Sequence, residues 1–188
     1  MKHQELAQEA HAASVERGFW PVQHSNEHCM MLVITEVAEM VEADRKGRHA
    51  DLQAYKDGIA PELKTRRGWY GVVDDPELFR KYIKDTTADE MADIAIRLYD
   101  MAGALNMDFS KYNAIRYNRD FAKFEFVENA FALTKGLANE SYQIERRILF
   151  GLHYIEMWAN AENIQLYAHI RLKMAYNATR GIRHGKNY

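Results

Sequence analysis

Apolar residues recur every three or four positions along much of the chain, which is the spacing of one face of an α-helix. Between about residues 26 and 45 the stripe consists of Val33, Val37, Met40 and Val41. A second stripe, which begins after residue 87, consists of Met91, Ile94, Leu98, Met101 and Leu105. Both stripes predict amphipathic helices that bury one face.

Helical patterns also cover residues 3 to 17, roughly 110 to 135 and 139 to 160. A last helix, with Ile170, Met174 and Ala178 on one face, ends near Gly181. No segment has the two-residue alternation that is typical of a β-strand. The chain is therefore predicted to be all-α, a helical bundle.

Residues 47 to 85 have a different character, because glycines and prolines repeatedly interrupt the helical pattern. We interpret them as a long insert that contains short helical pieces. Thr87 then fits the N-cap of the next helix. Glu90 lies three residues later, as in a capping box.

The composition indicates one domain over residues 1 to 188, since 47% hydrophobic and 28% charged residues are ordinary for a soluble protein. The net charge of -2 provides no global basic field for a nucleic acid to follow, so a nucleic-acid partner is not expected. The longest wholly apolar run, Cys29 to Ile34, is too short for a membrane span. A polar N-terminus and a single cysteine favour a cytoplasmic protein without a membrane partner.

Two pairs of acidic residues carry the most specific chemistry. Glu36 and Glu39 lie on the first striped helix, and Glu90 and Asp93 lie on the second. Each pair is spaced i, i+3, so both of its carboxylates lie on one side of their helix. If the apolar stripes pack together, the four carboxylates meet across the seam and repel one another. A hard divalent cation, Mg²⁺ or alternatively Mn²⁺, relieves that repulsion.

The alternative interpretation is a solvated acidic face with no function, because isolated Glu-x-x-Glu pairs are common on helices. Arg97 lies on the same side of its helix as Glu90 and Asp93. An intrahelical salt bridge from Arg97 therefore competes with the metal interpretation.

The C-terminal helix carries a candidate phosphate-binding face. Lys173, Asn177 and Arg180 are spaced i, i+4, i+7 and line one side of it. Arginine offers a bidentate fork to phosphate oxygens, and lysine offers a point charge. Further candidates follow Gly181: Arg183, His184 and Lys186. The alternative is a basic helix end that only complements the helix dipole.

A candidate base pocket precedes the first acidic helix. Trp20 can stack on a nucleobase, with His24 beside it, and Asn26 can read the edge of the base. The alternative is that Trp20 and its neighbour Phe19 are core anchors for the first helix.

Together these segments resemble the all-α NTP pyrophosphohydrolase superfamily, which includes MazG-like proteins and dimeric dUTPases. The family pattern Glu-x-x-Glu and Glu-x-x-Asp is matched at residues 36 to 39 and 90 to 93, and a later Lys-x-x-x-Asn-x-x-Arg at 173 to 180. The resemblance covers roughly residues 15 to 46, 86 to 107 and 164 to 188. The long gap between the acidic pairs and a helical insert at about 108 to 163 depart from the family.

The resemblance implies Mg²⁺-dependent hydrolysis of a nucleoside triphosphate, favouring a deoxynucleoside triphosphate, to the monophosphate and pyrophosphate. The resemblance implies that two or more Mg²⁺ ions bridge the four carboxylates and the phosphates. Metal-bound water attacks the α-phosphorus, and Glu36 or Glu39 accepts its proton. Lys173 and Arg180 stabilise the departing pyrophosphate. The resemblance also implies a homodimer or a higher homo-oligomer.

Two other interpretations compete with this one. A di-iron carboxylate bundle requires Glu-x-x-His pairs, which neither acidic helix has. A non-enzymatic helical bundle that binds nucleic acid or a protein partner is motivated by the basic C-terminus and by the cluster of Lys64, Arg66 and Arg67.

Overall fold

The computed structural model describes residues 3–59, 75–111 and 119–182, and in these ranges it is all-α, as predicted. Two 3-10 turns, at Phe109–Lys111 and Phe121–Lys123, accompany the helices. The α-helices of the described residues are α1 (His3–Glu16), α2 (Asn26–Arg45), α3 (Leu52–Gly58), α5 (Pro76–Tyr82), α6 (Thr87–Ala104), α7 (Phe126–Leu137), α8 (Ile144–Ala161) and α9 (Leu166–Ala178).

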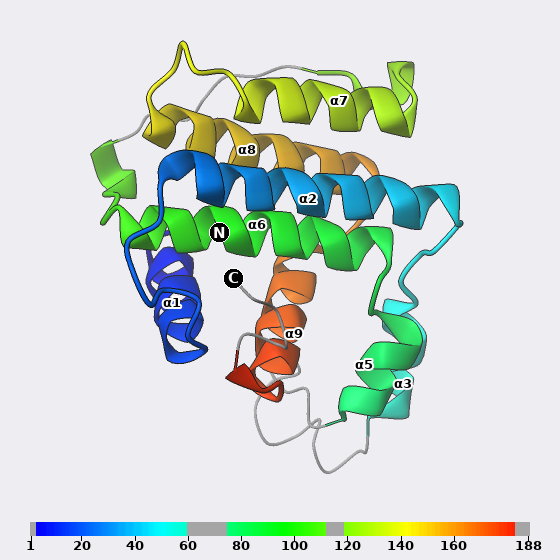
Figure 1. Ribbon diagram of the computed structural model, residues 1–188. Helices are drawn as coiled ribbons and strands as arrows, with labels where there is room; N and C mark the ends of the chain where they lie inside the picture. The colour runs from blue at the N-terminus through cyan, green and yellow to red at the C-terminus, as the bar shows by residue number, and fades with distance from the viewer. Residues whose placement is uncertain (1–2, 60–74, 112–118, 183–188) are drawn as a thin grey trace.

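Helix α6 is the centre of the bundle. It packs against α1, α2, α8 and α9, and α7 covers α2 and α8 from the outer side (Figure 1). The predicted stripes explain this position, because Val33 and Met40 of α2 and Met91, Ile94 and Leu98 of α6 are all buried in one core. Leu105, predicted as buried, is only partly buried at the end of α6.

The starts of α2 and α6 are fixed by side-chain caps. The Ser25 hydroxyl accepts a hydrogen bond from the backbone N–H of His28 at 3.1 Å. At α6 the prediction of Thr87 as N-cap is wrong by one residue. Thr86 is the cap, and its hydroxyl accepts from the N–H of Asp89, while Thr87 is the first helical residue. Asp89, and not Glu90, is therefore the third residue after the cap.

In the described residues 119–125, before α7, the chain does not form the continuous α-helix predicted from about residue 110. Asn129 of α7 donates to the carbonyl of Phe121 at 3.1 Å and accepts from Arg119 at 2.7 Å, which holds a non-helical turn against the helix. The Phe121 ring packs against Tyr154 and Trp158 of α8. The helix predicted from residue 139 starts at Ile144, after a turn that the Asn139 side chain closes by accepting from Ser141.

The predicted insert at 47–85 contains short helices in its described part, as expected. Helices α3 and α5 form a second small core with α9, in which Phe79 stacks on Tyr176 at 4.3 Å between ring centroids. This core anchors the C-terminal helix beside the end of α5. Over the described ranges the model has no helix with both the length and the apolar character needed to traverse a bilayer.

The close approach of α1 to α6 gives a stability test at Gly103. A Cβ at this position would lie 2.4 Å from the Ala7 carbonyl oxygen and 2.5 Å from the His11 Cβ. We expect Gly103→Ala to lower the free energy of unfolding by about 1–3 kcal/mol, because the two helices must move apart. Chemical denaturation measures this. Gly181→Ala is the control, since no heavy atom lies within 4 Å of its Cβ, and equal stability of the two variants would contradict the packing.

Candidate functional site

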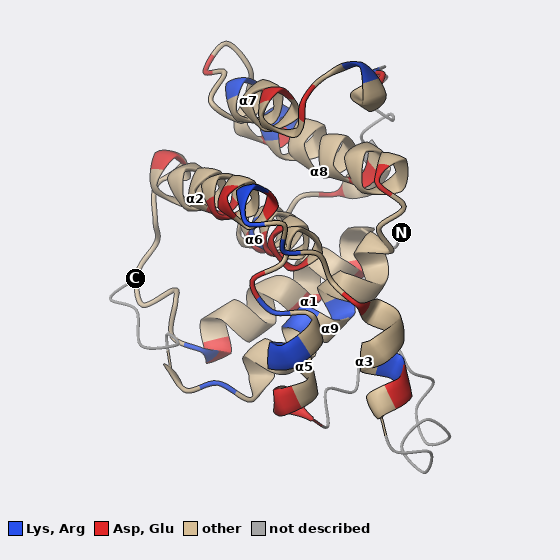
Figure 2. Cartoon of the chain, turned by 90° about the vertical axis from the view of Figure 1, so that its right-hand side faces the viewer, with Lys and Arg blue, Asp and Glu red and all other residues tan. Residues whose placement is uncertain are grey.

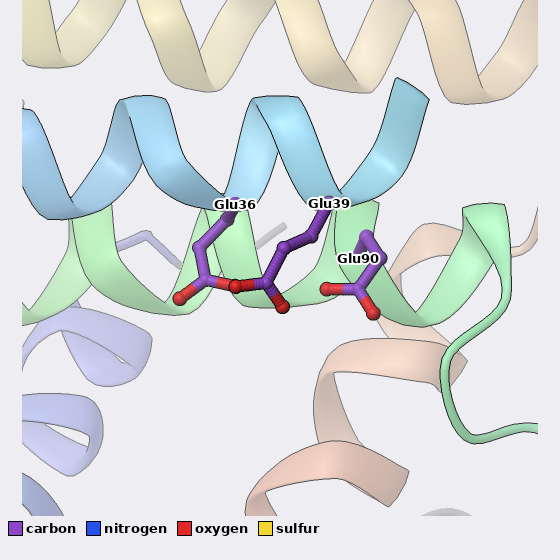
Figure 3. A group of neighbouring side chains, drawn as sticks. All are labelled: Glu36, Glu39 and Glu90. Carbon is purple, nitrogen blue, oxygen red and sulfur yellow. The ribbon is translucent and has the colours of Figure 1, made fainter. Parts of the chain in front are cut away.

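The acidic edges of α2 and α6 meet as the sequence predicted for three of the four carboxylates. Glu36 and Glu39 of α2 and Glu90 of α6 each place one oxygen within 4.8 Å of the others (Figure 3). Glu36 and Glu90 are only 3% and 5% exposed, whereas Glu39 is exposed. The group therefore has a buried wall and an open side.

Burial makes this cluster electrostatically costly. It raises the pKa of Glu90 to about 8, with the Asp93 carboxylate as the next cause. Burial, and then Asp93, also raise the pKa of Glu36, while Arg97 opposes the shift. A bound hard cation would favour the charged form of each group, because carboxylate oxygens are the ligands that Mg²⁺ and Mn²⁺ prefer.

Arg97 joins the two helices and does not form the intrahelical bridge considered above. Its Nε donates to Glu36 Oε1 at 2.5 Å, from α6 to α2. Glu36 is thus oriented by a charged partner on one side. Arg97 therefore neutralises only part of the cluster, because Glu39 and Glu90 also lie beside Glu36.

Asp93 is paired with Lys173 of α9. The Lys173 ammonium lies 2.7 Å from Asp93 Oδ2 and 2.7 Å from Asp89 Oδ2. Burial alone would lower the pKa of Lys173, but the carboxylates of Asp93 and Asp89 outweigh it and raise that pKa. Lys173 was predicted as a phosphate-binding residue, and in the structure it is a buried counter-ion of two aspartates.

Asp89 also belongs to this site, although the sequence pattern did not predict it as a site residue. It is completely buried, and burial raises its pKa to about 6 despite the adjacent Lys173. Asp89 lies in the first turn of α6, where the positive end of the helix dipole favours any acidic residue. What distinguishes Asp89 from an ordinary residue at a helix start is its ion pair with Lys173, which lies 84 positions later in the chain.

A cavity of about 340 Å³ joins the two predicted halves of the site. This volume is in the range of small-ligand sites. Its lining includes all four predicted acids and the predicted face of the last helix: Glu36, Glu39, Glu90, Asp93, Lys173, Asn177 and Arg180. Acidic positions on neighbouring stretches of α2 and α6 are visible in Figure 2. One cavity thus combines an anionic wall with basic and amide groups.

The end of α9 is held next to α1 by Arg17. Its guanidinium donates to the carbonyl of Ala178 at 2.6 Å and to that of Arg180 at 3.0 Å. The Ala178 carbonyl is one of those that a helix C-terminus leaves without an intrahelical partner, and Arg180 lies two residues beyond the helix. Arg180 in turn lies 3.4 Å from the Asn177 side-chain oxygen. These contacts place Asn177 and Arg180 at the cavity. Arg183, His184 and Lys186, also predicted to bind phosphate, lie outside the described residues.

Aromatic side chains also line the cavity. Trp20 and His24 belong to this lining, and His24 stacks on His28 at 4.4 Å between ring centroids. The Trp20 indole donates to the Asp100 carboxylate at 3.0 Å, and His11 lies 2.8 Å from the same carboxylate. Trp20 is therefore fixed by a polar contact, and it is not a fully buried core anchor.

The proposed role of Asn26 in reading a base is not supported. Asn26 is the exposed first residue of α2, and it is not among the residues that line the cavity. Its position follows from the Ser25 cap, which makes Asn26 the first residue of the helix.

Comparison with known proteins adds no family. The chain matches no protein-family model, no curated protein and no solved structure. The chemistry therefore follows from the side chains and their arrangement.

His169 of α9 gives a pH test of the packing behind the site. Burial lowers its pKa to about 4, and its Nδ1 has no hydrogen-bond partner in the described part of the chain. The unfolded chain takes up a proton near pH 6.5 and the folded chain only near pH 4. Stability from neutral His169 is therefore complete above pH 6.5 and is lost as the pH falls toward 4, by roughly 3 kcal/mol.

We expect His169→Leu to remove this part of the pH dependence. The difference in unfolding free energy between the variant and the wild type, measured from pH 7.5 to 4, should shift in favour of the variant as the pH falls. Altered packing in the variant would change this difference by the same amount at every pH. Only the pH dependence of the difference therefore reports the titration of His169. A difference that does not vary with pH would show that His169 titrates normally.

Proposed function

We propose that this chain is a hydrolase that uses a divalent metal to cleave a nucleoside triphosphate, with deoxynucleoside triphosphates favoured, into the monophosphate and pyrophosphate. This is the activity of the all-α NTP pyrophosphohydrolase superfamily that its motifs resemble. One observation carries the proposal. The carboxylate cluster of α2 and α6 and the Asn177–Arg180 end of α9 line the same cavity.

The donor set fits a hard cation. Glu36, Glu39 and Glu90 offer only carboxylate oxygens. Burial raises the pKa of Glu36 and of Glu90, so a bound cation would stabilise the charged form of both. These three residues, with Asp93 nearby, would hold Mg²⁺ or Mn²⁺. When bound, the metal supplies Lewis-acid activation of water and of phosphate oxygens.

Glu39 is the best candidate to accept the proton of the attacking water. It is exposed at the cavity, and no ion pair to it occurs within the described ranges. Glu36, by contrast, already accepts from Arg97. A carboxylate with an open oxygen can take a proton from a water positioned beside it, which is what general-base catalysis requires.

Arg180 and Lys173 have different roles in this proposal. The Arg180 guanidinium lies at the cavity and can bind the departing pyrophosphate through a bidentate fork. Lys173 forms ion pairs with Asp89 and Asp93 beside the proposed metal site. Trp20 and His24 provide flat surfaces suited to a nucleobase.

The proposal includes a homodimer or a higher homo-oligomer, as the family resemblance implies. The outer face of α7 supports it, because Val127 and Phe131 are 51% and 65% exposed one helical turn apart. A cytoplasmic location is part of the same proposal.

We expect a panel of NTPs and dNTPs with Mg²⁺ to yield monophosphate and pyrophosphate. Hydrolysis in H₂¹⁸O tests the site of attack directly. Attack at the α-phosphorus places the label in the monophosphate, whereas attack at the β-phosphorus places it in pyrophosphate. Release of inorganic phosphate, or salt-sensitive nucleic-acid binding without turnover, would favour a different function.

Removal of single carboxylates separates catalysis from folding. We expect Glu39→Gln and Asp93→Asn each to lower kcat at least about 100-fold, because the first removes the proton acceptor and the second alters the charge of the metal site. Steady-state kinetics measures this, with circular dichroism to confirm the fold. Glu42→Gln is the matched control, since Glu42 is exposed on the same helix and pairs with Lys46. Activity near that of the control in both variants would refute the assignment.

A further inference from the structure

Asp100 is an acidic residue of the cavity that the proposed metal site does not use. It lines the cavity, but it belongs to no group of acids that are close enough to share a cation among the described residues. It follows Asp93 by two helical turns and therefore lies on the same face of α6. At 1.5 Å per residue the two positions are roughly 10 Å apart along the helix axis. A nucleoside separates its base from its phosphates by a distance of this order.

The Asp100 carboxylate meets the edge of the Trp20 indole. The indole N–H donates to Asp100 Oδ1 at 3.0 Å and to Oδ2 at 3.1 Å. Because this N–H lies in the plane of the ring, the carboxylate lies beside the ring edge. Trp20 itself lines the cavity. A base that stacks on the part of the indole that faces the cavity therefore brings its own edge close to Asp100.

Asp100 has acceptor capacity that its neighbours do not use. The side chains of His11, Ser14 and Trp20 donate to it, whereas an ionised carboxylate can accept about four hydrogen bonds. Its side chain is 18% exposed, and no lysine or arginine pairs with it within the described ranges. An ionised carboxylate accepts and does not donate, so a ligand group that binds here must carry a donor.

The task of holding Trp20 in place does not account for a carboxylate at this position. Burial raises the pKa of Asp100, and the hydrogen bonds from His11, Ser14 and Trp20 oppose the shift. An amide oxygen would accept from the indole N–H without the cost of placing a charge in a partly buried site. The negative charge therefore calls for a role beyond packing.

A fixed acceptor distinguishes nucleobases by the groups on their edges. Adenine, cytosine and guanine carry an exocyclic amino group. Uracil, thymine and hypoxanthine lack it, and uracil and thymine present a carbonyl oxygen where cytosine has its amino group. A carboxylate oxygen binds the amino group and repels the carbonyl oxygen, so it discriminates by attraction and by repulsion.

We propose that Asp100 is a specificity-determining residue, which makes the cavity select nucleotides whose base carries an amino group. The inference rests on the proposed function, because it places a nucleotide in this cavity. Trp20 supplies the stacking surface, and Asp100 accepts one N–H of the amino group. A hydrogen bond to a charged acceptor corresponds to a discrimination of about tenfold or more.

Pairs of nucleotides that differ in the amino group test the inference. With Mg²⁺ present, kcat/KM is measured for dATP, dCTP and dGTP. The partners without the amino group are dITP for the two purines and dUTP for dCTP. We expect the best substrate to carry the amino group and to exceed its partner at least about tenfold. The corresponding monophosphates, which the proposed reaction does not cleave, give the same comparison as dissociation constants in calorimetry.

Asp100→Asn changes the acceptor and keeps the shape of the side chain. Its amide oxygen still accepts from Trp20, and its NH₂ group can donate to a base carbonyl. We expect the preference to fall at least about tenfold, toward equal use of the two partners. A purely structural role would lower activity toward both partners together and leave their ratio unchanged. Asp57→Asn is the control, because Asp57 is exposed and lies outside the cavity lining.

The outcomes separate this inference from the proposed function. Hydrolysis that is fastest for dITP or dUTP, or a preference that Asp100→Asn leaves unchanged, would overturn the inference and leave the proposed hydrolysis intact. Selective binding of the monophosphates that depends on Asp100, without cleavage of any triphosphate, would support the inference and contradict the proposed hydrolysis. Neither turnover nor binding of any nucleotide would overturn both.

Discussion

The packing of α2 against α6 is the constraint on which the rest of the structure depends. Because Val33, Met40, Ile94 and Leu98 must be buried together, the helices cannot rotate their acidic residues into bulk water. Glu36 and Glu90 are brought into the seam by hydrophobic burial, which offsets the repulsion between them. The acidic residues therefore lie at the edge of the core, where their charge must be compensated by basic side chains or by a cation.

That compensation is partial and comes from distant parts of the chain. Arg97 reaches from α6 to Glu36, and Lys173 reaches from α9 to Asp89 and Asp93. Each cation neutralises one side of the acidic region. Within the described ranges Glu39 and Glu90 have no ion-pair partner, and both line the cavity. This incomplete compensation is the reason why we propose a metal ion and a phosphate ligand for this cavity.

The sequence predicted what depends on periodicity and missed what depends on tertiary contact. The bounds of α2 and the burial of Met91 and Ile94 follow from local spacing, so they could be predicted. The turn before α7 could not, because Asn129 holds it from within the next helix. Asp89 could not be distinguished from a helix-start residue without knowing where Lys173 lies. Pair spacing placed Glu36, Glu39 and Glu90 together, but it could not tell that Asp93 turns toward α9.

The central claim is that the acidic seam between α2 and α6 holds a hard cation. Anomalous X-ray diffraction from crystals soaked in Mn²⁺ tests it most directly, because the signal locates the ion without any assumption about activity. We expect a peak within about 2.2 Å of carboxylate oxygens of Glu36, Glu39 and Glu90. Those side chains turned apart into solvent, with no peak between α2 and α6, would contradict the account.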